Sequence, residues 1–146
     1  MKAVIQRVNS AQLSVDGQLI SAIRKGLVAY FCVESGDDEN QCNVFAQKLS
    51  KLRIFEDENG KMNLSIKDVH GELLFVSQFT LAADLSGGNR PSFVNAEKPD
   101  RAKALYEKTT KLIESCGVIV KTGVFGADMT IDQQNAGPVT IIWSDK

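Results

Sequence analysis

ELLFVSQFT, residues 72–80, predicts the central strand of this chain and the point at which that strand ends. The apolar run Leu73–Val76 does not alternate with polar residues, which is typical of a strand covered on both faces. Ser77, Gln78 and Thr80 follow it at once, so polar side chains gather where a buried strand meets a loop. Active sites commonly lie at such places, because the scaffold holds the residues rigidly while the loop leaves them accessible.

Strand-like segments and two helices surround this stretch. Strands are predicted at residues 2–8, 11–15, 18–23, 27–33, 72–79, 118–121, 129–132 and 139–143. Asp16-Gly17 and Asn59-Gly60 are hairpin signals, the second between the strand-like segments 53–56 and 61–64. Because the two helices are separated by hairpins instead of alternating with strands, the pattern indicates the α+β class.

The two helices have recognisable starts and apolar faces. Asp37 and Asp38 can cap a helix that runs to about Leu52. Pro99 begins a second helix at a position where its missing N–H costs nothing, and Gly117 ends that helix. The residues predicted to be buried are Val44, Phe45, Lys48, Leu49 and Leu52 in the first helix, and Ala102, Leu105, Tyr106, Thr109, Leu112 or Ile113, and Cys116 in the second.

Length and composition restrict the class of protein. A chain of 146 residues that is 43% hydrophobic and 24% charged is predicted to be one soluble domain over residues 1–146. No apolar stretch is long enough to span a membrane, and Gln6 and Arg7 come too early for a signal-peptide core, so a cytoplasmic protein is expected. A net charge of −1 argues against DNA and other non-specific nucleic-acid binding. Recognition of a single nucleotide end by stacking remains compatible with it.

Neither the cysteines nor the histidine predict a metal or cofactor site. Cys32, Cys42 and Cys116 are widely spaced, which fits three thiols in a reducing compartment and neither a disulfide framework nor zinc ligands. His70, the only histidine, is either a general base near neutral pH or, as its turn-like surroundings favour, a solvated loop residue. No cofactor and no metal are therefore expected.

From the residues alone, the cluster at Ser77, Gln78 and Thr80 has more than one interpretation. The more economical one is that the three side chains satisfy local backbone groups at a strand end. Alternatively, Gln78 and the backbone N–H groups of this segment stabilise developing negative charge. Thr80 is also a candidate nucleophile, although no base is apparent to activate its hydroxyl. Gly137-Pro138 is likewise a turn before a strand or an element of the site.

SQFTL at residues 77–81 and NAGPVT at 135–140 together resemble the signature of the D-aminoacyl-tRNA deacylases, and the resemblance covers nearly the whole chain. It implies a compact, barrel-like mixed sheet with two helices, assembled as a homodimer. It also implies a proofreading hydrolase in translation that binds the 3′ acceptor end of D-aminoacyl-tRNA and cleaves the ester, with mischarged glycyl-tRNA as a further substrate. The catalytic residues that it implies are Ser77, Gln78, Phe79 and Thr80.

The same resemblance assigns roles in substrate binding. The Gly137-Pro138 bond would be cis and would enter the partner subunit's site, leaving space for a D side chain and rejecting an L one. Arg7 would brace this segment, with an exposed strand arginine as the alternative. Arg90 would contact phosphate at the tRNA end. Phe125 and Met129 would pack on the terminal adenosine, with core packing as their alternative.

Two positions depart from the family pattern. Ala136 stands where an aspartate usually precedes the Gly-Pro, and the stretch around Ser86 and Gly87 lacks the usual basic residue. The first departure concerns how the Gly-Pro segment is held, and the second concerns how firmly the tRNA end is bound. They leave open a non-catalytic binding module with the same fold. A hydrolase of small esters or thioesters that uses Cys32 or Ser77 is a further alternative.

Overall fold

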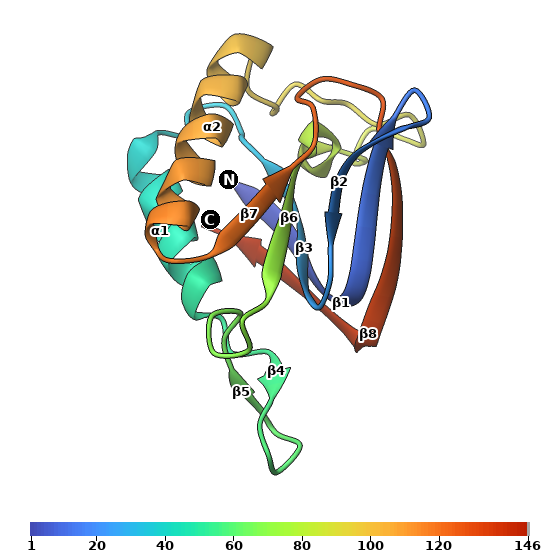
Figure 1. The fold of residues 1–146 in the computed structure, drawn as a ribbon. Helices are drawn as coiled ribbons and strands as arrows, with labels where there is room; N and C mark the ends of the chain where they lie inside the picture. Colours follow the sequence, from blue (N-terminus) through green and yellow to red (C-terminus); the bar gives the residue numbers. More distant parts are fainter. Residues whose placement is uncertain (146) are drawn as a thin grey trace.

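The computed structural model describes residues 1–145, in which two helices cover one side of a large curved sheet (Figure 1). The strands of this sheet are β1 (Lys2–Val15), β2 (Gln18–Ile23), β3 (Gly26–Cys32), β6 (Glu72–Ser77), β7 (Ile119–Thr122) and β8 (Thr130–Ser144). The other elements are α1 (Glu39–Lys51), the small hairpin of β4 (Phe55–Glu56) and β5 (Met62–Leu64), the short turn η1 (Phe79–Ala82) and α2 (Pro99–Ser115). Within residues 1–145 neither helix combines the length and apolar character needed to cross a bilayer.

The large sheet is mixed and has the strand order β2-β1-β3-β6-β7, with β8 attached to β1. β1 is antiparallel to β2, β3 and β8, whereas β6 is parallel to both β3 and β7. The Ser21 hydroxyl of β2 donates to the Thr122 carbonyl of β7 at 2.5 Å, which brings the two edges together and nearly closes a barrel. The predicted α+β class and barrel-like mixed sheet are confirmed.

β1 and β8 are long strands where the sequence predicted pairs of short ones. β1 continues through residues 9 and 10 because it has ladder partners along its length, first β3 and then β2 on one side, and β8 on the other. β8 joins the predicted strands 129–132 and 139–143 across Gly137-Pro138. Proline is tolerated there because β8 pairs with β1 alone among the described strands, and an edge strand can do without one ladder donor.

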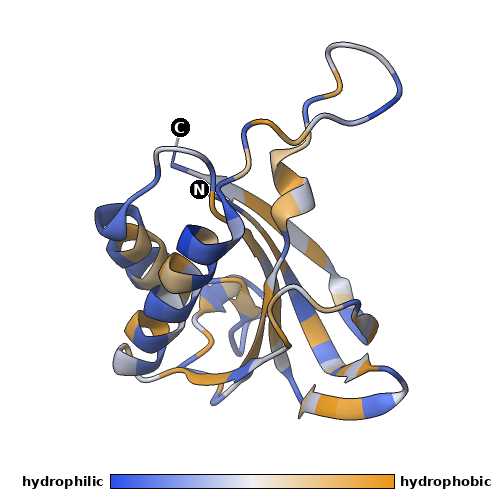
Figure 2. Cartoon of the chain, turned by 90° about the horizontal axis from the view of Figure 1, so that it is seen from above, coloured by the Kyte–Doolittle hydropathy of each residue, from blue (hydrophilic) through white to orange (hydrophobic). Residues whose placement is uncertain are grey.

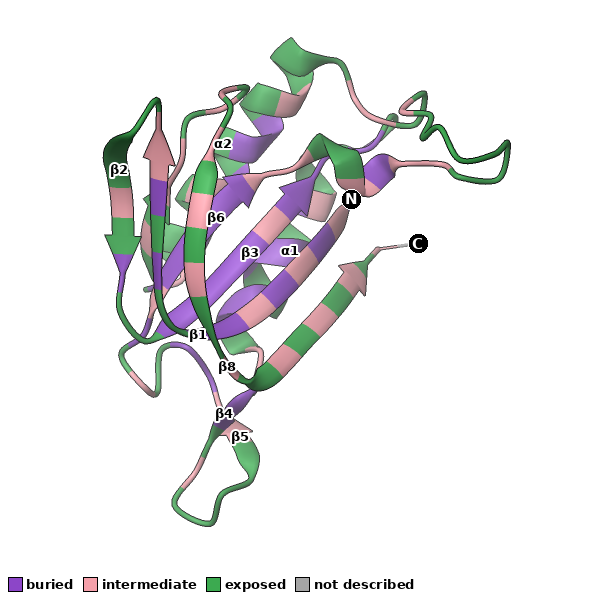
Figure 3. Cartoon of the chain, turned by 90° about the vertical axis from the view of Figure 1, so that its right-hand side faces the viewer, coloured by how far each residue is buried: buried purple, intermediate pink, exposed green. Residues whose placement is uncertain are grey.

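β6 is buried on both faces, as its unbroken apolar run predicts. Leu73 and Phe75 face a core between the sheet and the helices, where the Phe75 ring centroid lies 5.1 Å from that of Phe31. Leu74 and Val76 face a second core inside the barrel. Figure 3 shows mainly buried residues along β3 and β6, and intermediate residues alternating with exposed ones along β8.

α1 begins where the sequence predicts, but its buried face differs from the prediction. Asp38 and Gln41 form a capping box at its start. Val44 and Lys48 are exposed, and Leu52 is the C-cap rather than a helical residue. The buried residues include Cys42, Phe45, Ala46 and Leu49, which follow the i, i+3, i+4, i+7 spacing of one helix face.

The small side chain of Cys42 faces α2, where it allows close packing. The Cys42 Sγ lies 3.6 Å from the Leu105 carbonyl oxygen. In α2 the buried residues are Leu105, Tyr106, Thr109 and Ile113, so Ile113 is the buried member of the predicted alternatives Leu112 and Ile113, whereas the predicted Ala102 and Cys116 are only half-buried. Figure 2 shows hydrophobic and hydrophilic residues alternating around the helices, as expected for helices with one buried side.

Candidate active site

A cleft lies beyond the edge of the sheet at which three parallel strands end. β3, β6 and β7 run in the same direction, so their carboxyl ends meet at one edge, where ligands commonly bind in sheets of this kind. The cleft has a volume of about 720 Å³. It is lined by Cys32 and Val33 at the end of β3, by Ser77–Phe79 at the end of β6, and by Phe125–Met129 after β7, with the start of α2 completing it.

β6 ends at Ser77 instead of the predicted Phe79, because the chain turns there into η1. The Gln78 N–H donates to the Phe31 carbonyl at 2.8 Å and is therefore engaged with β3. The Leu81 N–H donates back to the Gln78 carbonyl at 3.3 Å and closes the turn. The N–H groups of Phe79 and Thr80 stand at the start of the turn, where backbone donors have no partner within it.

The side chains of Gln78 and Thr80 bond to each other. Gln78 Nε2 donates to Thr80 Oγ1 at 2.6 Å. An amide donor cannot take a proton from the hydroxyl, so this contact does not activate Thr80 as a nucleophile. His70 offers no help, because it lies exposed in the turn before β6, and that strand spans roughly 20 Å. Its φ of 51° is that of a tight turn, in keeping with the favoured prediction of a solvated loop residue.

Cys32 lines the cleft as an un-ionised thiol. It is 1% exposed, and burial, together with the nearby Glu34 carboxylate, raises its pKa to about 11. The carbonyl oxygens of Val33 and Phe79 each accept from its Sγ at 3.5 Å. Since the thiolate is the nucleophilic form, Cys32 offers almost no nucleophile at neutral pH. The geometry therefore gives no support to a hydrolase that uses Cys32.

Two carboxylates that the sequence did not single out also line the cleft, namely Glu97 and Asp128. The Lys98 N–H donates to the Glu97 carboxylate at 2.7 Å, and the Arg101 guanidinium pairs with it. These contacts, the backbone N–H first, hold the pKa of Glu97 below its usual range and make it a weak base. Sequence reasoning did not single out Glu97, because an isolated acidic residue in a loop carries no signal that it lines a cleft.

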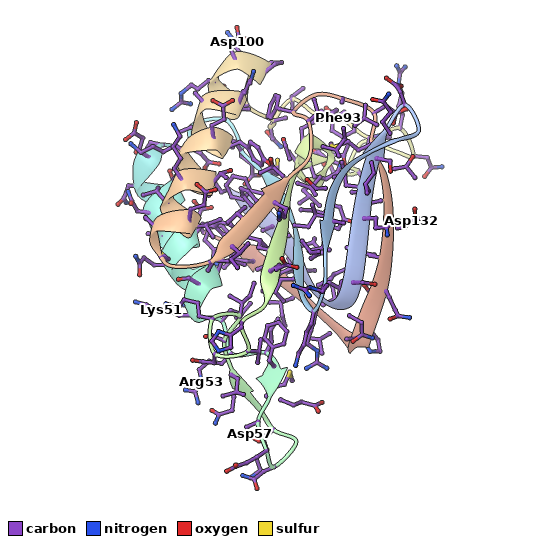
Figure 4. All side chains as sticks on the ribbon, viewed as in Figure 1. Lys51, Arg53, Asp57, Phe93, Asp100 and Asp132 are labelled. Atoms are coloured by element: carbon purple, nitrogen blue, oxygen red, sulfur yellow. The ribbon has the colours of Figure 1, made fainter. Side chains whose placement is uncertain are left out.

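Aromatic and thioether side chains form the apolar part of the cleft. Phe125 and Met129 line it and are half-buried, and Phe125 packs against the core beneath the helices while Met129 packs against the core inside the barrel, so the predicted core packing is observed for both. Phe93, labelled in Figure 4, lines the cleft as well, and its ring lies edge-on to that of Phe79 at a centroid distance of 5.1 Å. Phe93 belongs to the stretch 88–93, which also resembles the family pattern and is a predicted wall for the terminal adenosine, although the sequence did not indicate which of its side chains folds back into the cleft.

Arg90 is not brought into the cleft. The backbones of Asp84 and Ser92 bond to each other at 2.8 and 2.9 Å, which makes the segment between them a surface loop (Figure 3). Arg90 is exposed in this loop and is not among the residues that line the cleft. The structure of one chain therefore separates Arg90 from the other candidate residues.

Gly137-Pro138 and Arg7 lie together, but outside this cleft. Arg7 is only 9% exposed, and it donates from Nε to the Ala136 carbonyl at 3.1 Å and from Nη1 to the Ile54 carbonyl at 2.8 Å. Gly137 and Pro138 are exposed and joined by a cis peptide bond. Arg7 thus supports the segment from its buried side. Because Arg7 contacts the backbone of Ala136, the residue type at this position does not enter the contact.

Comparison with known proteins identifies the family. The sequence matches the family model of D-Tyr-tRNA(Tyr) deacylase over residues 4–144. The chain belongs to this family. The resemblance predicted from SQFTL and NAGPVT is thereby confirmed.

Relatives and solved structures match this family member over nearly its full length. A D-aminoacyl-tRNA deacylase of Magnetococcus marinus is 52% identical over 99% of the chain and 96% of the relative. One of Lactobacillus acidophilus is 51% identical over 97% and 98%. The structure of a c-Myc DNA Unwinding Element Binding Protein is 37% identical, with a TM-score of 0.94 over 100% of this chain and 99% of that one. A probable eukaryotic D-amino acid tRNA deacylase, 16% identical with a TM-score of 0.83 over 97% of both chains, shares the fold.

Proposed function

We propose that the protein hydrolyses the ester that joins a D-amino acid to the 3′-terminal ribose of tRNA. Family membership and the full-length relatives support this activity, and the prediction of an ester hydrolase of the D-aminoacyl-tRNA deacylase class is confirmed. The observation that carries the proposal is the cleft at the ends of three parallel strands. It combines backbone donors at a rigid turn with apolar walls, and its size is that of a small-molecule site.

In the proposed reaction the protein positions the ester and stabilises the negative charge that develops on its carbonyl oxygen. An aminoacyl ester is already activated, so positioning and a few well-placed donors are sufficient. The proposed donors are the N–H groups of Phe79 and Thr80, because the N–H of Gln78 is bonded to Phe31. Ser77 and the Gln78 side chain line the cleft beside them and orient the substrate.

The ribose 2′-OH of the substrate is the proposed proton carrier. Water forms the new bond to the carbonyl carbon, the 2′-OH accepts its proton, and the 2′-OH passes a proton to the departing 3′ oxygen. No histidine lines the cleft among residues 1–145, and Glu97 is a weak base because of its contacts to Lys98 and Arg101. The other carboxylate that lines the cleft is that of Asp128. Replacing Asp128 therefore tests whether a protein carboxylate, instead of the ribose 2′-OH, accepts the proton of water.

Discrimination between D and L esters is proposed to come from Gly137-Pro138 of a partner subunit in a homodimer. The segment is exposed, is held from behind by Arg7 and does not line the cleft of its own chain, which suits an element that acts on another copy. Its carbonyls would hold the α-ammonium of the amino acid, leaving space for a D side chain and a clash for an L one. Glycine has no side chain to exclude, so mischarged glycyl-tRNA is a proposed further substrate.

The terminal adenosine is proposed to pack against the apolar wall of the cleft. Phe125 and Met129 are half-buried there, with Phe93 nearby, so a base could stack on the aromatic rings and pack against the Met129 thioether. Arg90 lies outside the cleft in its exposed loop, and its proposed contact is a backbone phosphate farther along the acceptor end.

Deacylation of matched D- and L-tyrosyl-tRNA by the purified protein, in the presence of a chelator, tests the function. We expect rapid release from the D ester only, with no loss of rate in the chelator. Release from both esters would overturn the chiral filter, and release from neither would leave a binding module as the better description. With a terminal 2′-deoxy substrate the rate should fall nearly to background, whereas Asp128→Asn should retain most of its activity.

Thr80 as nucleophile is the competing mechanism, and it gives a different result. Because the Thr80 hydroxyl accepts from the Gln78 amide nitrogen, which cannot take its proton, Thr80→Ala should retain substantial kcat. A loss of several orders of magnitude, together with a trappable acyl-enzyme in the wild type, would establish the nucleophile and overturn the substrate-assisted reaction.

A further inference from the structure

A chain of side-chain hydrogen bonds joins Tyr30 on β3 to both flanks of the Gly137-Pro138 segment. The Tyr30 hydroxyl donates to Gln133 Oε1 at 2.9 Å. Gln133 Nε2 then donates to Gln6 Oε1 at 2.8 Å and to Asn135 Oδ1 at 2.6 Å. Gln6 Nε2 in turn donates to Thr140 Oγ1 at 3.2 Å. These five side chains, of Tyr30, Gln133, Gln6, Asn135 and Thr140, are called the Tyr30 relay below.

The Tyr30 relay has a direction. A side-chain amide has an accepting end and a donating end, so fixing one end fixes the other. When Tyr30 donates to the oxygen of Gln133, the nitrogen of Gln133 is turned toward Gln6 and Asn135. The oxygen of Gln6 is then occupied, and its nitrogen is turned toward Thr140. The orientation of both amides therefore depends on the hydroxyl at the start of the relay.

The position of the Tyr30 side chain is fixed by its packing and by its place in the sheet. Its half-buried ring packs on the core inside the barrel, and it lies opposite Val76 of β6 in the sheet register. Burial raises the pKa of the Tyr30 hydroxyl above its ordinary value, so the group remains a neutral donor at physiological pH. Gln133 lies two positions after Ile131 on β8, on the same face of the strand and therefore toward the same core.

The segment that the relay reaches lies outside the regular strand ladder, although Val139 within it packs against the core beneath the helices. Gln6 pairs with Thr140 and Val8 pairs with Asn135, so residues 136–139 of β8 bulge opposite Arg7 and leave the regular ladder. Gln6 and Arg7 are consecutive on a strand and point to opposite faces. Arg7 holds the segment through the Ala136 carbonyl on one face, and the relay holds its two flanks on the other. Figure 4 labels Asp132 on β8, the residue that precedes Gln133 in the chain.

We propose that Tyr30 is a positioning residue for Gly137-Pro138, acting through Gln133 and Gln6, and that it contributes to the selectivity between D and L esters. The inference rests on the proposed function, since it takes Gly137-Pro138 as the chiral filter. Tyr30 does not touch the substrate in this scheme. Loss of the Tyr30 hydroxyl lets the side-chain amides of Gln133 and Gln6 rotate, so the position of Gly137-Pro138 is less precisely fixed.

Tyr30→Phe tests the proposal, because it removes one oxygen and keeps the ring. We measure kcat and KM for D- and L-tyrosyl-tRNA and take the ratio of the two kcat/KM values. The loss of a single hydrogen bond predicts a fall in this ratio of about fivefold. We expect the fall to come from a higher KM for the D ester and faster release from the L ester, with kcat for the D ester unchanged.

A double-mutant cycle separates the relay from a general loss of packing. If Tyr30 acts through Gln133, Gln133→Leu lowers the ratio by itself, and adding Tyr30→Phe to it has no further effect. Independent, additive effects of the two substitutions would overturn the relay. Tyr106→Phe is the matched control, since its hydroxyl donates to the Phe75 carbonyl at 2.7 Å, outside the relay. It should lower the melting temperature and leave the D-to-L ratio unchanged.

The outcomes distinguish this proposal from the function on which it rests. A wild-type protein that releases neither amino acid overturns the proposed function and the selectivity role of Tyr30 with it. A selective wild type whose ratio is unchanged by Tyr30→Phe overturns the relay alone. An equal fall in the ratio for Tyr106→Phe would also overturn it, because the effect would then follow from reduced stability.

Discussion

Replacing Arg7 by methionine should cost a large share of the folding free energy, because two carbonyl groups then lose their donor. Arg7 donates to the Ile54 carbonyl at 2.8 Å and to the Ala136 carbonyl at 3.1 Å. Methionine keeps an unbranched apolar stem of similar length, so the packing of the stem is largely retained. The change therefore removes mainly the guanidinium group and its hydrogen bonds.

The magnitude follows from the surroundings of the two acceptors. Ile54 is buried, with 6% exposure, so its carbonyl loses a charged donor without gaining water, at a cost of about 1.5–3 kcal/mol. Ala136 is half-exposed, so its carbonyl is partly rehydrated, and the cost there is about 0.5–1 kcal/mol. The sum is about 2–4 kcal/mol, against a total stability of about 5–15 kcal/mol for a domain of ordinary stability.

Urea unfolding followed by circular dichroism measures this difference, and Arg53→Met is the matched control. Arg53 also donates from Nε to a carbonyl, that of Asn63 at 2.8 Å. Unlike Arg7, it is exposed, next to Ile54 at the base of the β4–β5 hairpin. Its replacement should change the unfolding free energy by less than about 0.5 kcal/mol. A loss below about 0.5 kcal/mol for Arg7→Met, or equal losses for the two variants, would refute the reasoning.

Three further predictions follow from the cleft and the sheet. Iodoacetamide at pH 7 should leave activity intact, because the pKa of about 11 keeps Cys32 a thiol, and its labelling should accelerate only at high pH; rapid inactivation would contradict this. Gly26→Ala should destabilise by about 3 kcal/mol or more in thermal unfolding, because its Cβ would lie 1.8 Å from the Glu72 carbonyl oxygen. The lowered pKa of Glu97 means that its stabilising effect is present at neutral pH and is lost as the pH falls below about 4.3. When the unfolding free energy is measured against pH, Glu97→Gln should therefore lose less stability in acid than the wild type.

Local patterns were sufficient to predict most elements of this fold. The unbroken run Leu73–Val76 predicted a strand buried on both faces, and it separates two cores. Asp38 and Pro99 marked the starts of the two helices, because capping and proline placement depend on neighbouring residues only. The errors occurred where partners matter. The alternation in β1 and β8 did not reveal that each is one long strand, since continuity there comes from ladder partners far along the chain.

For the candidate site, the sequence by itself determined the family, the polar cluster that ends β6 and the Gly-Pro segment. Only the tertiary structure decided which of these residues lie together. The parallel pairing of β3, β6 and β7 brings Cys32, Ser77 and Phe125 to one cleft, although they are distant in sequence, and the same sheet leaves Gly137-Pro138 outside it. The physical reason is range: capping and burial periodicity act over a few residues and can be read locally, whereas strand pairing is selected by the packing of the whole core.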